Sequence, residues 1–193
     1  MQRTDIIQAA AEIFRQKGYQ ASSMQDIADA VGLQKASLYH HVASKQEILV
    51  EILDQALDLL ISDMQAVLAT DLAPDAQLRQ AIRSYVGRMT QEVSLAAVLQ
   101  LEHRNLEPRI RARHIARRDR YDALWRELIR RGVEKGTFHA VDEDIVAFAV
   151  LGVQNWMITW YRPDGRLAPE AIADQFADLF LSGLRNETST KPN

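Results

Sequence analysis

Residues 22–47 read SSMQDIADAVGLQKASLYHHVASKQE, and this stretch decides the fold of the N-terminal region. Apolar residues recur in its first part at the spacing of one buried stripe on a helix. These residues are Met24, Ile27, Ala28 and Val31. Gly32 then interrupts the pattern, as a tight turn between two crossed helices requires. The stretch therefore predicts two short helices joined by a turn at Gly32.

The second of these helices is expected from about residue 34 to residue 42, and it buries little. Leu38 and Val42 are its inward anchors, four positions apart. The other face is polar and carries Gln34, Lys35, Ser37, Tyr39, His40 and His41. A helix with so few apolar anchors and so many hydrogen-bonding side chains suits insertion into the major groove of DNA. Ser44 and Glu47 have the spacing of a capping box, which predicts a new helix starting near Lys45.

This stretch and the helix before it resemble the DNA-binding domain of the TetR family of transcriptional regulators. The match runs from about Ile6 to Leu49 and includes the segments IIQAAAEIFRQKGYQASSM, IADAVG and LYHHV-x-SKQEIL. Val42 stands where the family mostly has phenylalanine, but it remains apolar. The resemblance implies a three-helix helix-turn-helix domain, and it implies a DNA-binding regulator.

The DNA contacts that the resemblance implies fall on the predicted second helix and its flanks. Base edges would be met by Gln34, Lys35, Ala36 and Ser37, and phosphates by Tyr39, His40 and Lys45. Side chains of these types can bond to purine edges or meet a thymine methyl group. Ser23 can cap a helix and also donate to a phosphate; capping alone remains the alternative. Metal binding by His40 and His41 is not expected, because adjacent helical residues point about 100° apart.

Composition sets the remaining bounds. The chain has 193 residues, 47% of them hydrophobic, no cysteine and a net charge of −3. No apolar run approaches the roughly 20 residues of a membrane span, so a cytoplasmic protein without membrane contact is expected. Residues 1–47 hold five basic and five acidic side chains, which is weak for a DNA-binding domain. One copy should therefore bind DNA weakly, and function should depend on dimerisation.

The rest of the chain predicts an all-α fold of about nine helices. Helical patterns cover residues 4–17, 45–69, 75–92, 95–101, 108–135, 143–161 and 169–185. The expected domains are a helix-turn-helix domain (1–47), a helical ligand-binding and dimerisation domain (48–185) and a disordered tail (186–193). The long helix 45–69 reaches beyond the first domain, so it could transmit a distant binding event.

The last two helical segments are apolar on more than one side. In residues 143–161 one stripe contains Ile145, Phe148, Gly152, Trp156 and Trp160, and a second contains Val146, Val150, Val153, Met157 and Tyr161. An all-round apolar helix needs cover on both sides. Its own domain can supply one cover and a second subunit the other. The family resemblance likewise implies a homodimer formed through the last two helices.

The ligand site is expected among aromatic, polarizable or isolated polar residues on predicted inward faces. These are Met89, Leu99, His103, Tyr121, Trp125, Phe148, Asn155, Trp156 and Trp160. An apolar pocket with a few polar groups is the usual form of a small-molecule site, although each residue could instead be plain core. The stretch NWMITWYRPDGRLAPE is similar to effector domains of TetR-type regulators of fatty-acid or acyl-CoA metabolism, which implies a lipid-like or acyl-CoA effector.

Two interpretations of the arginine-rich segment stay open. Residues 107–135 hold ten basic and five acidic side chains, which suits either an anion site or a solvated face with pairs such as Arg130–Glu134. An enzyme is not expected, because no Ser/His/Asp set, phosphate loop or HExxH motif is present. A helical adaptor without DNA binding is a further alternative. The sequence thus predicts a ligand-responsive repressor without a cofactor or metal, dimeric on a near-palindromic operator.

Overall fold

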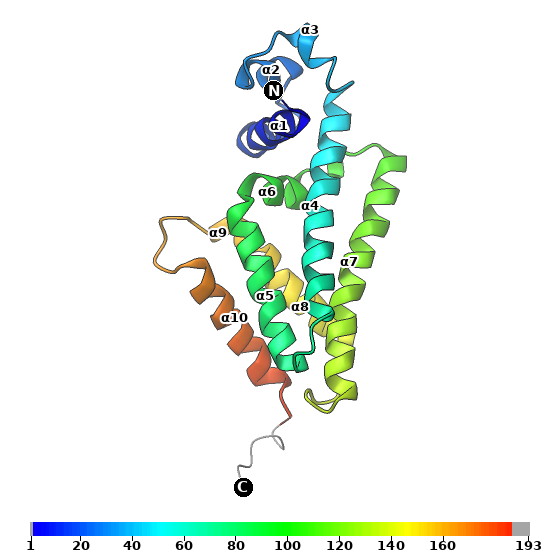
Figure 1. Cartoon of the computed structure of the whole chain (residues 1–193), viewed down its shortest axis with the longest axis vertical. Coiled ribbons are helices and arrows are strands. Elements are labelled where there is room, and N and C mark those ends of the chain that lie inside the picture. Colours follow the sequence, from blue (N-terminus) through cyan, green and yellow to red (C-terminus); the bar gives the residue numbers. More distant parts are fainter. Residues whose placement is uncertain (1, 187–193) are drawn as a thin grey trace. The chain divides into compact units, whose positions relative to one another are not determined.

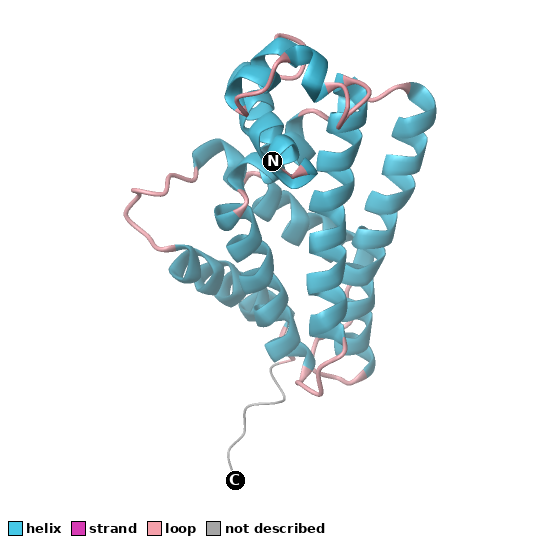
Figure 2. Ribbon diagram, turned by 45° about the horizontal axis from the view of Figure 1, so that its top comes forward, coloured by secondary structure: helices cyan, strands magenta, loops and turns pink. Residues whose placement is uncertain are grey.

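The structure is a computed structural model that describes residues 2–186, and the expected all-helical fold is confirmed. Figure 2 shows helices joined by loops throughout the described part of the chain. The chain divides into two compact units. Unit 1 contains residues up to 59 together with 92–118, and unit 2 contains residues 60–91 together with those from 119 onward.

Unit 1 is built around the first helix. Its elements are α1 (Arg3–Lys17), α2 (Met24–Ala30), α3 (Lys35–Leu38), the first part of α4 (Lys45–Leu68), α6 (Val93–Leu101), the 3₁₀ turn η1 (His103–Asn105) and the first part of α7 (Pro108–Glu134). α1 buries Ile6, Ile7 and Phe14 and packs against both α2 and α6. Gly18 ends α1 with a φ of 79°, a conformation that glycine adopts without strain.

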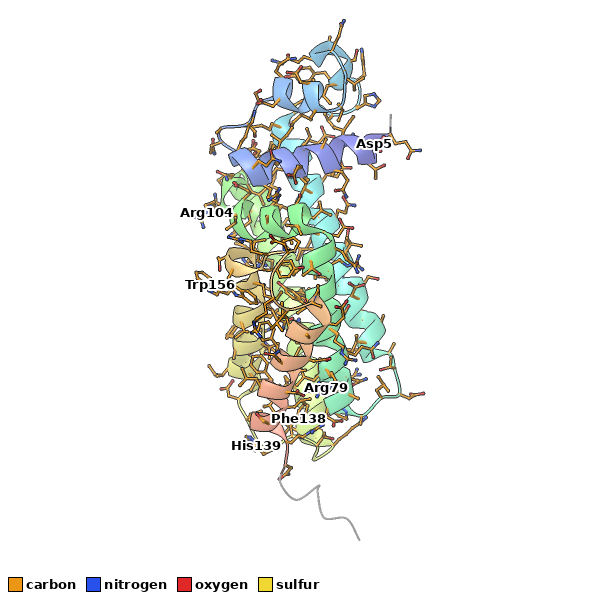
Figure 3. All side chains as sticks on the ribbon, turned by 90° about the vertical axis from the view of Figure 1, so that its left-hand side faces the viewer. Asp5, Arg79, Arg104, Phe138, His139 and Trp156 are labelled. Atoms are coloured by element: carbon orange, nitrogen blue, oxygen red, sulfur yellow. The ribbon has the colours of Figure 1, made fainter. Side chains whose placement is uncertain are left out.

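Unit 2 is a bundle formed by the remaining helices. Its elements are the second part of α4, α5 (Pro74–Gln91), the second part of α7, α8 (Glu143–Asn155), α9 (Met157–Trp160) and α10 (Pro169–Leu184). α5 and α10 lie side by side (Figure 1), and ion pairs join them. Phe138 and His139 lie beside the C-terminal end of α10 (Figure 3), where the amide of His139 donates to the carbonyl of Leu184 at 3.0 Å.

Two expected helices are shorter in the structure than the sequence pattern predicted. The helix expected at residues 34–42 ends at Leu38, because the amides of His40 and His41 bond carbonyls only three residues back. The helix expected at residues 143–161 is interrupted at Trp156, where the Thr159 amide and hydroxyl both bond the Trp156 carbonyl. In both segments the apolar spacing continues past the end of the helix. The helices end because the local hydrogen-bond pattern changes.

The expected domains remain a prediction. The compact units do not follow the expected boundary at residue 47, because α4 and α7 each contribute residues to both units. The expected tail lies outside the described residues except for Asn186. Within residues 2–186, no helix combines the length and the apolar character needed to cross a bilayer.

Candidate DNA-binding surface and effector cavity

The N-terminus of α2 is fixed by one of the two serines that could cap it. The Asp26 amide donates to Ser23 Oγ at 3.1 Å, and the Ser23 amide donates to the Asp26 carboxylate at 2.8 Å. Ser22 instead is buried and donates to the carbonyl of Tyr19 at 2.7 Å. Ser23 is therefore the cap and remains exposed, while Ser22 holds the preceding turn together.

The surface of α3 has the character expected of a recognition element. Leu38 is fully buried and Val42 nearly so, which anchors the segment in unit 1. Gly32 makes the turn before it, with a φ of 67°. The outward side chains are those of Gln34, Lys35, Ala36, Tyr39, His40 and His41, with Ser37 half-buried. Unit 1 thus presents a polar face whose hydrogen-bonding groups are directed to solvent.

Ion pairs neutralise most of the basic groups around this face. Arg3 pairs with Glu47 and Glu51 at 2.6 Å each, and Lys17 pairs with Asp26 at 2.6 Å. Arg15 pairs with Glu12 at 2.5 Å. Lys35 stands on the outward face of α3 and makes no ion pair with the residues that the structure describes. It is therefore the cation of this region best placed to meet a phosphate or a base edge.

Lys45, which the resemblance places at a phosphate, is directed inward in this structure. Its ammonium donates to the carbonyls of Tyr19 and Ser22 at 2.7 and 2.6 Å. It also lies 4.4 Å from the centre of the Tyr19 ring, a cation–π distance. Burial lowers the pKa of the ammonium. The phosphate contact thus stays a prediction that requires these bonds to break, whereas the observed role is to tie α4 to residues 19–22.

Unit 2 contains a small cavity between α4, α5 and α7. Its volume is about 10 Å³, close to the smallest space that holds one water molecule. The lining residues are Leu60, Asp63, Met64, Ala81, Ser84, Tyr85, Tyr121 and Trp125. Most of this wall is apolar, but it carries several polar groups, which is the usual character of a small-molecule site.

The polar groups of the cavity wall differ in how they are satisfied. Tyr85 donates to the side-chain oxygen of Asn155, and Asp63 accepts two bonds from Arg88 at 2.9 Å. Trp125 is fully buried, and its Nε1 makes no hydrogen bond of ordinary geometry, although the indole N–H acts on the hydroxyl of Tyr121. Burial also raises the pKa of Tyr121 well above its usual value. A poorly satisfied N–H in a mostly apolar wall is a site at which a ligand oxygen would be favoured.

The structure separates the expected ligand residues into different environments. Tyr121 and Trp125 line the cavity, and Asn155 reaches it through Tyr85. Met89 is buried in unit 2, whereas Leu99 (buried) and His103 (half-buried) belong to unit 1. The sequence pattern contained Met64, Ala81 and Tyr85 on inward stripes, but nothing in it distinguished cavity lining from plain core.

The expectation that Phe148 and Trp156 face inward is wrong. They are 53% and 66% exposed in the chain, and Figure 3 shows Trp156 at the edge of unit 2. Trp160 is 43% exposed, but it lines a separate pocket of about 300 Å³ together with Phe176 of α10. α8 turns its other face to the core, which buries Ala147, Val150, Leu151 and Gln154. Both faces are apolar, so the stripe that carries the large aromatics was assigned to the wrong side of the helix.

The arginines of α7 are largely engaged in ion pairs. The expected Arg130–Glu134 pair is present, and the other pairs are Arg113–Asp54, Arg117–Asp54, Arg117–Asp58, Arg126–Asp144, Arg130–Glu127 and Arg131–Glu127. These contacts support the interpretation of the segment as a solvated, ion-paired face over most of its length. The stretch around His114 has a different environment, which is described below.

Two regions of the chain each match a known protein-family model. Residues 6–52 match the family model described as bacterial regulatory proteins, tetR family. Residues 71–184 match the model described as the C-terminal domain of tetracycline repressor-like proteins. These two regions contain α3 with its exposed polar face and the cavity-lining residues of α5 and α7, respectively.

Individual proteins resemble the chain over most of its length. The HTH-type transcriptional repressor KstR2 of Rhodococcus jostii (strain RHA1) is 30% identical over 184 residues, which cover 94% of this chain and 90% of KstR2. The structure of the regulator PfmR from Thermus thermophilus is 40% identical with a TM-score of 0.87, covering 94% and 99% of the two chains. AibR, solved with isovaleryl coenzyme A and operator DNA, is 31% identical with a TM-score of 0.84, covering 92% and 96%.

Proposed function

Because the chain belongs to the TetR family of bacterial transcriptional regulators, we propose that it is a ligand-responsive repressor. It binds a near-palindromic operator as a homodimer, and a small apolar or acyl-CoA-like effector releases it. The observation that carries this proposal is the exposed polar face of α3, which is held in unit 1 by the buried side chains of Leu38 and Val42.

In this proposal α3 enters the major groove of one operator half-site. Gln34, Lys35, Ala36 and Ser37 meet base edges, while Ser23, Tyr39 and His40 bond phosphates. In a dimer of this kind the two recognition helices lie about 34–36 Å apart, one turn of the DNA helix, or a multiple of it. The near-neutral charge of residues 1–47 explains why two copies are needed for tight binding.

The proposed dimer interface is the uncovered apolar face of the last helices. Ile145 and Leu179 are 65% and 63% exposed, on the same unit as the exposed aromatics of α8 and α9. Several large exposed apolar side chains on neighbouring helices are typical of an interaction surface. A second copy of the chain offers a matching apolar face, as a two-fold symmetric interface requires.

The proposed effector occupies the cavity bordered by Tyr85, Tyr121 and Trp125. The cavity holds about one water molecule as it stands, so an effector must displace side chains that line it. Leu60 and Met64 of α4 are among these side chains, and the same helix begins at Lys45, directly after the recognition segment. A coupling of about 1–3 kcal/mol between effector and operator is typical of such regulators. The AibR complex supports an acyl-coenzyme A as the class of effector.

Operator binding is tested with DNA from the promoter of the protein's own gene, in gel shifts over a range of salt concentrations. Lys35→Ala and Tyr39→Phe should each weaken binding, and the loss for Lys35→Ala should be about tenfold or more. Lys135→Ala removes an exposed lysine of unit 2 and serves as the matched control. Unchanged affinity in both α3 variants would overturn the assignment of α3 as the recognition element.

Effector binding is tested by thermal unfolding in the presence of isovaleryl-CoA, hexanoyl-CoA and free coenzyme A. A ligand at a hundred times its dissociation constant stabilises a folded protein by about 2.7 kcal/mol, which gives a clear rise in the melting temperature. The acyl thioesters should stabilise the chain more than free coenzyme A. Equal shifts with all three would contradict recognition of the acyl group.

A further inference from the structure

Two histidines of unit 1 form a stacked pair that the proposed DNA and effector sites do not use. His103 belongs to η1 and His114 to α7. Their ring centres are 6.2 Å apart, with an angle of 20° between the ring planes. The pair therefore joins the turn that follows α6 to the first part of α7, within one compact unit.

The hydrogen-bonding capacity of this pair is largely unused. His114 is only 2% exposed, and neither of its ring nitrogens finds a partner among the described residues. His103 bonds the backbone of Leu99 and Gln100, but its Nδ1 has no partner among those residues. A neutral imidazole carries one N–H donor and one acceptor nitrogen. The donor of His103 is used by the backbone, whereas the buried donor of His114 has no acceptor, which is unfavourable by about 1–3 kcal/mol. This arrangement favours an incoming acceptor.

The charges around the pair are positive. Burial and the charges of Arg118 and Arg104 lower the pKa of His103. Burial also lowers the pKa of His114 to about 4, assisted by His103 and by Arg113, Arg117 and Arg118. The nearby carboxylates of Asp54 and Asp58 are bonded to Arg113 and Arg117. Unpaired imidazole nitrogens thus lie in a field that favours a negative charge.

A metal ion is a poor match for this site. Among residues 2–186, no group of three or more histidine, cysteine, aspartate or glutamate side chains could hold one. The neighbouring arginines would also repel a cation. An anion, in contrast, accepts hydrogen bonds from imidazole N–H groups and from guanidinium groups alike.

We propose that His103 and His114, together with Arg118, form a binding site for a small carboxylate or phosphate anion. The anion accepts N–H bonds from the pair and neutralises part of the arginine field. Its charge favours protonation of the rings, so binding takes up protons at mildly acidic pH. The site is separate from the cavity of unit 2 and goes beyond the proposed operator and acyl-effector functions.

The position of the pair gives such an anion a route to the DNA-binding segment. Asn105, two residues after His103, accepts a hydrogen bond from Gln20 at 2.7 Å. Ser94 of α6 donates to Glu12 of α1. α6 therefore holds α1, and η1 holds the turn between α1 and α2, so an anion that fixes His103 acts next to these contacts.

The test is an NMR titration of the full-length protein with histidine rings carrying ¹³C labels. Sodium acetate and inorganic phosphate are the probes, with sodium chloride of equal ionic strength as the reference. We expect saturable shifts of the His114 ring signals and a rise of about 1–3 units in its pKa. A response to acetate alone identifies a carboxylate site, a response to phosphate alone a phosphate site, and either result supports the proposal.

Two arginine variants distinguish anion binding at the histidine pair from a general effect of charge on the histidine signals. Arg118→Met should weaken anion binding about tenfold or more, because it removes a positive charge that acts on both histidines. Arg120→Met removes an exposed arginine of α7 that is not among the main causes of the pKa shift of either histidine, and it should leave the affinity nearly unchanged. Shifts that chloride reproduces, or that both variants affect equally, overturn the proposal. No DNA is present, so the result is independent of operator binding.

Discussion

The recognition segment and helix α8 were both interpreted from the spacing of their apolar residues, but only in the recognition segment did that spacing identify the buried face. In residues 34–42 two apolar residues lie among polar ones, and the structure buries those two, Leu38 and Val42. In α8 apolar residues occupy nearly every side, and the structure covers only the face that contains Val150. Phe148, on another face, is 53% exposed.

The difference shows what an apolar pattern can determine. Where one face of a helix is polar, the pattern identifies the buried face directly. Where both faces are apolar, the pattern shows that two covers are needed but does not assign them. The assignment then depends on which neighbours the rest of the fold supplies, and a missing neighbour points to a second subunit. The following predictions test which faces are covered.

The largest effect is expected at the anchor of the recognition segment. Leu38→Ala should lower the free energy of unfolding by about 2–5 kcal/mol, because it leaves a cavity under a one-turn helix. Urea unfolding measures the loss. Gln34→Ala, on the outward face of the same segment, should change stability by less than about 0.5 kcal/mol. A similar loss of unfolding free energy in Leu38→Ala and Gln34→Ala would contradict the assignment of one buried and one exposed face to this segment.

Because His114 is buried, the free energy of unfolding should depend on pH. The folded-state pKa of His114, about 4, lies below its usual value of 6.5, so the unfolded chain binds the proton first as the pH falls. Stability from this residue is therefore present above about pH 6.5 and is lost progressively toward pH 4, by an amount on the order of 3 kcal/mol. His114→Phe should flatten this part of the pH dependence of unfolding. An unchanged slope would show that His114 is not held neutral by burial.

The two faces of α8 should respond differently to substitution. Val150→Ala should lower the free energy of unfolding by about 1–3 kcal/mol, since it removes buried methyl groups. Phe148→Asp should instead raise the dimer dissociation constant about tenfold or more, because a central aromatic of an interface is replaced by a charge. Sedimentation equilibrium measures the second effect. A Phe148→Asp protein that dimerises like the wild type would contradict the proposed interface.

The smallest effect concerns the cap that starts α2. Ser23→Ala should destabilise unit 1 by about 1 kcal/mol through loss of the bond to the Asp26 amide, and Ser23→Gly by a few tenths. Ser182→Ala, at an exposed serine within α10, is the control and should be neutral within about 0.5 kcal/mol. Thermal unfolding resolves the difference. Equal effects at both serines would mean that capping does not contribute at Ser23.

Most of the fold could be predicted from local signals. Pro74, Pro108 and Pro169 each open a helix in the structure, and the Asp142 carboxylate caps α8. A fixed φ or a cap oxygen is a property of the residue itself, so the sequence alone identifies it. The ends of α3 and α8 depend on a switch to bonds three residues back, which no residue type in these segments required.

The candidate sites were less predictable because they depend on partners distant in sequence. Lys45 meets the carbonyls of Tyr19 and Ser22, and a helix-start lysine does not reveal which loop lies beside it. Tyr85 has the helical spacing of a buried residue of α5, yet its bond to Asn155 depends on how α5 and α8 meet within unit 2. The apolar stripes thus located the core, and only the three-dimensional arrangement distinguished cavity, interface and plain packing.

Unit 1 is assembled from two separate parts of the chain, and this affects the order in which it can form during synthesis. α1 packs against α6, which lies in the second part, residues 92–118. At about 5–20 residues per second, the ribosome needs roughly 3–12 s to extend the chain from residue 59 to residue 118. Until then the apolar face of α1 that meets α6 has no covering helix. The nascent DNA-binding segment therefore depends on later-made residues to become a finished unit, so it does not complete its fold first.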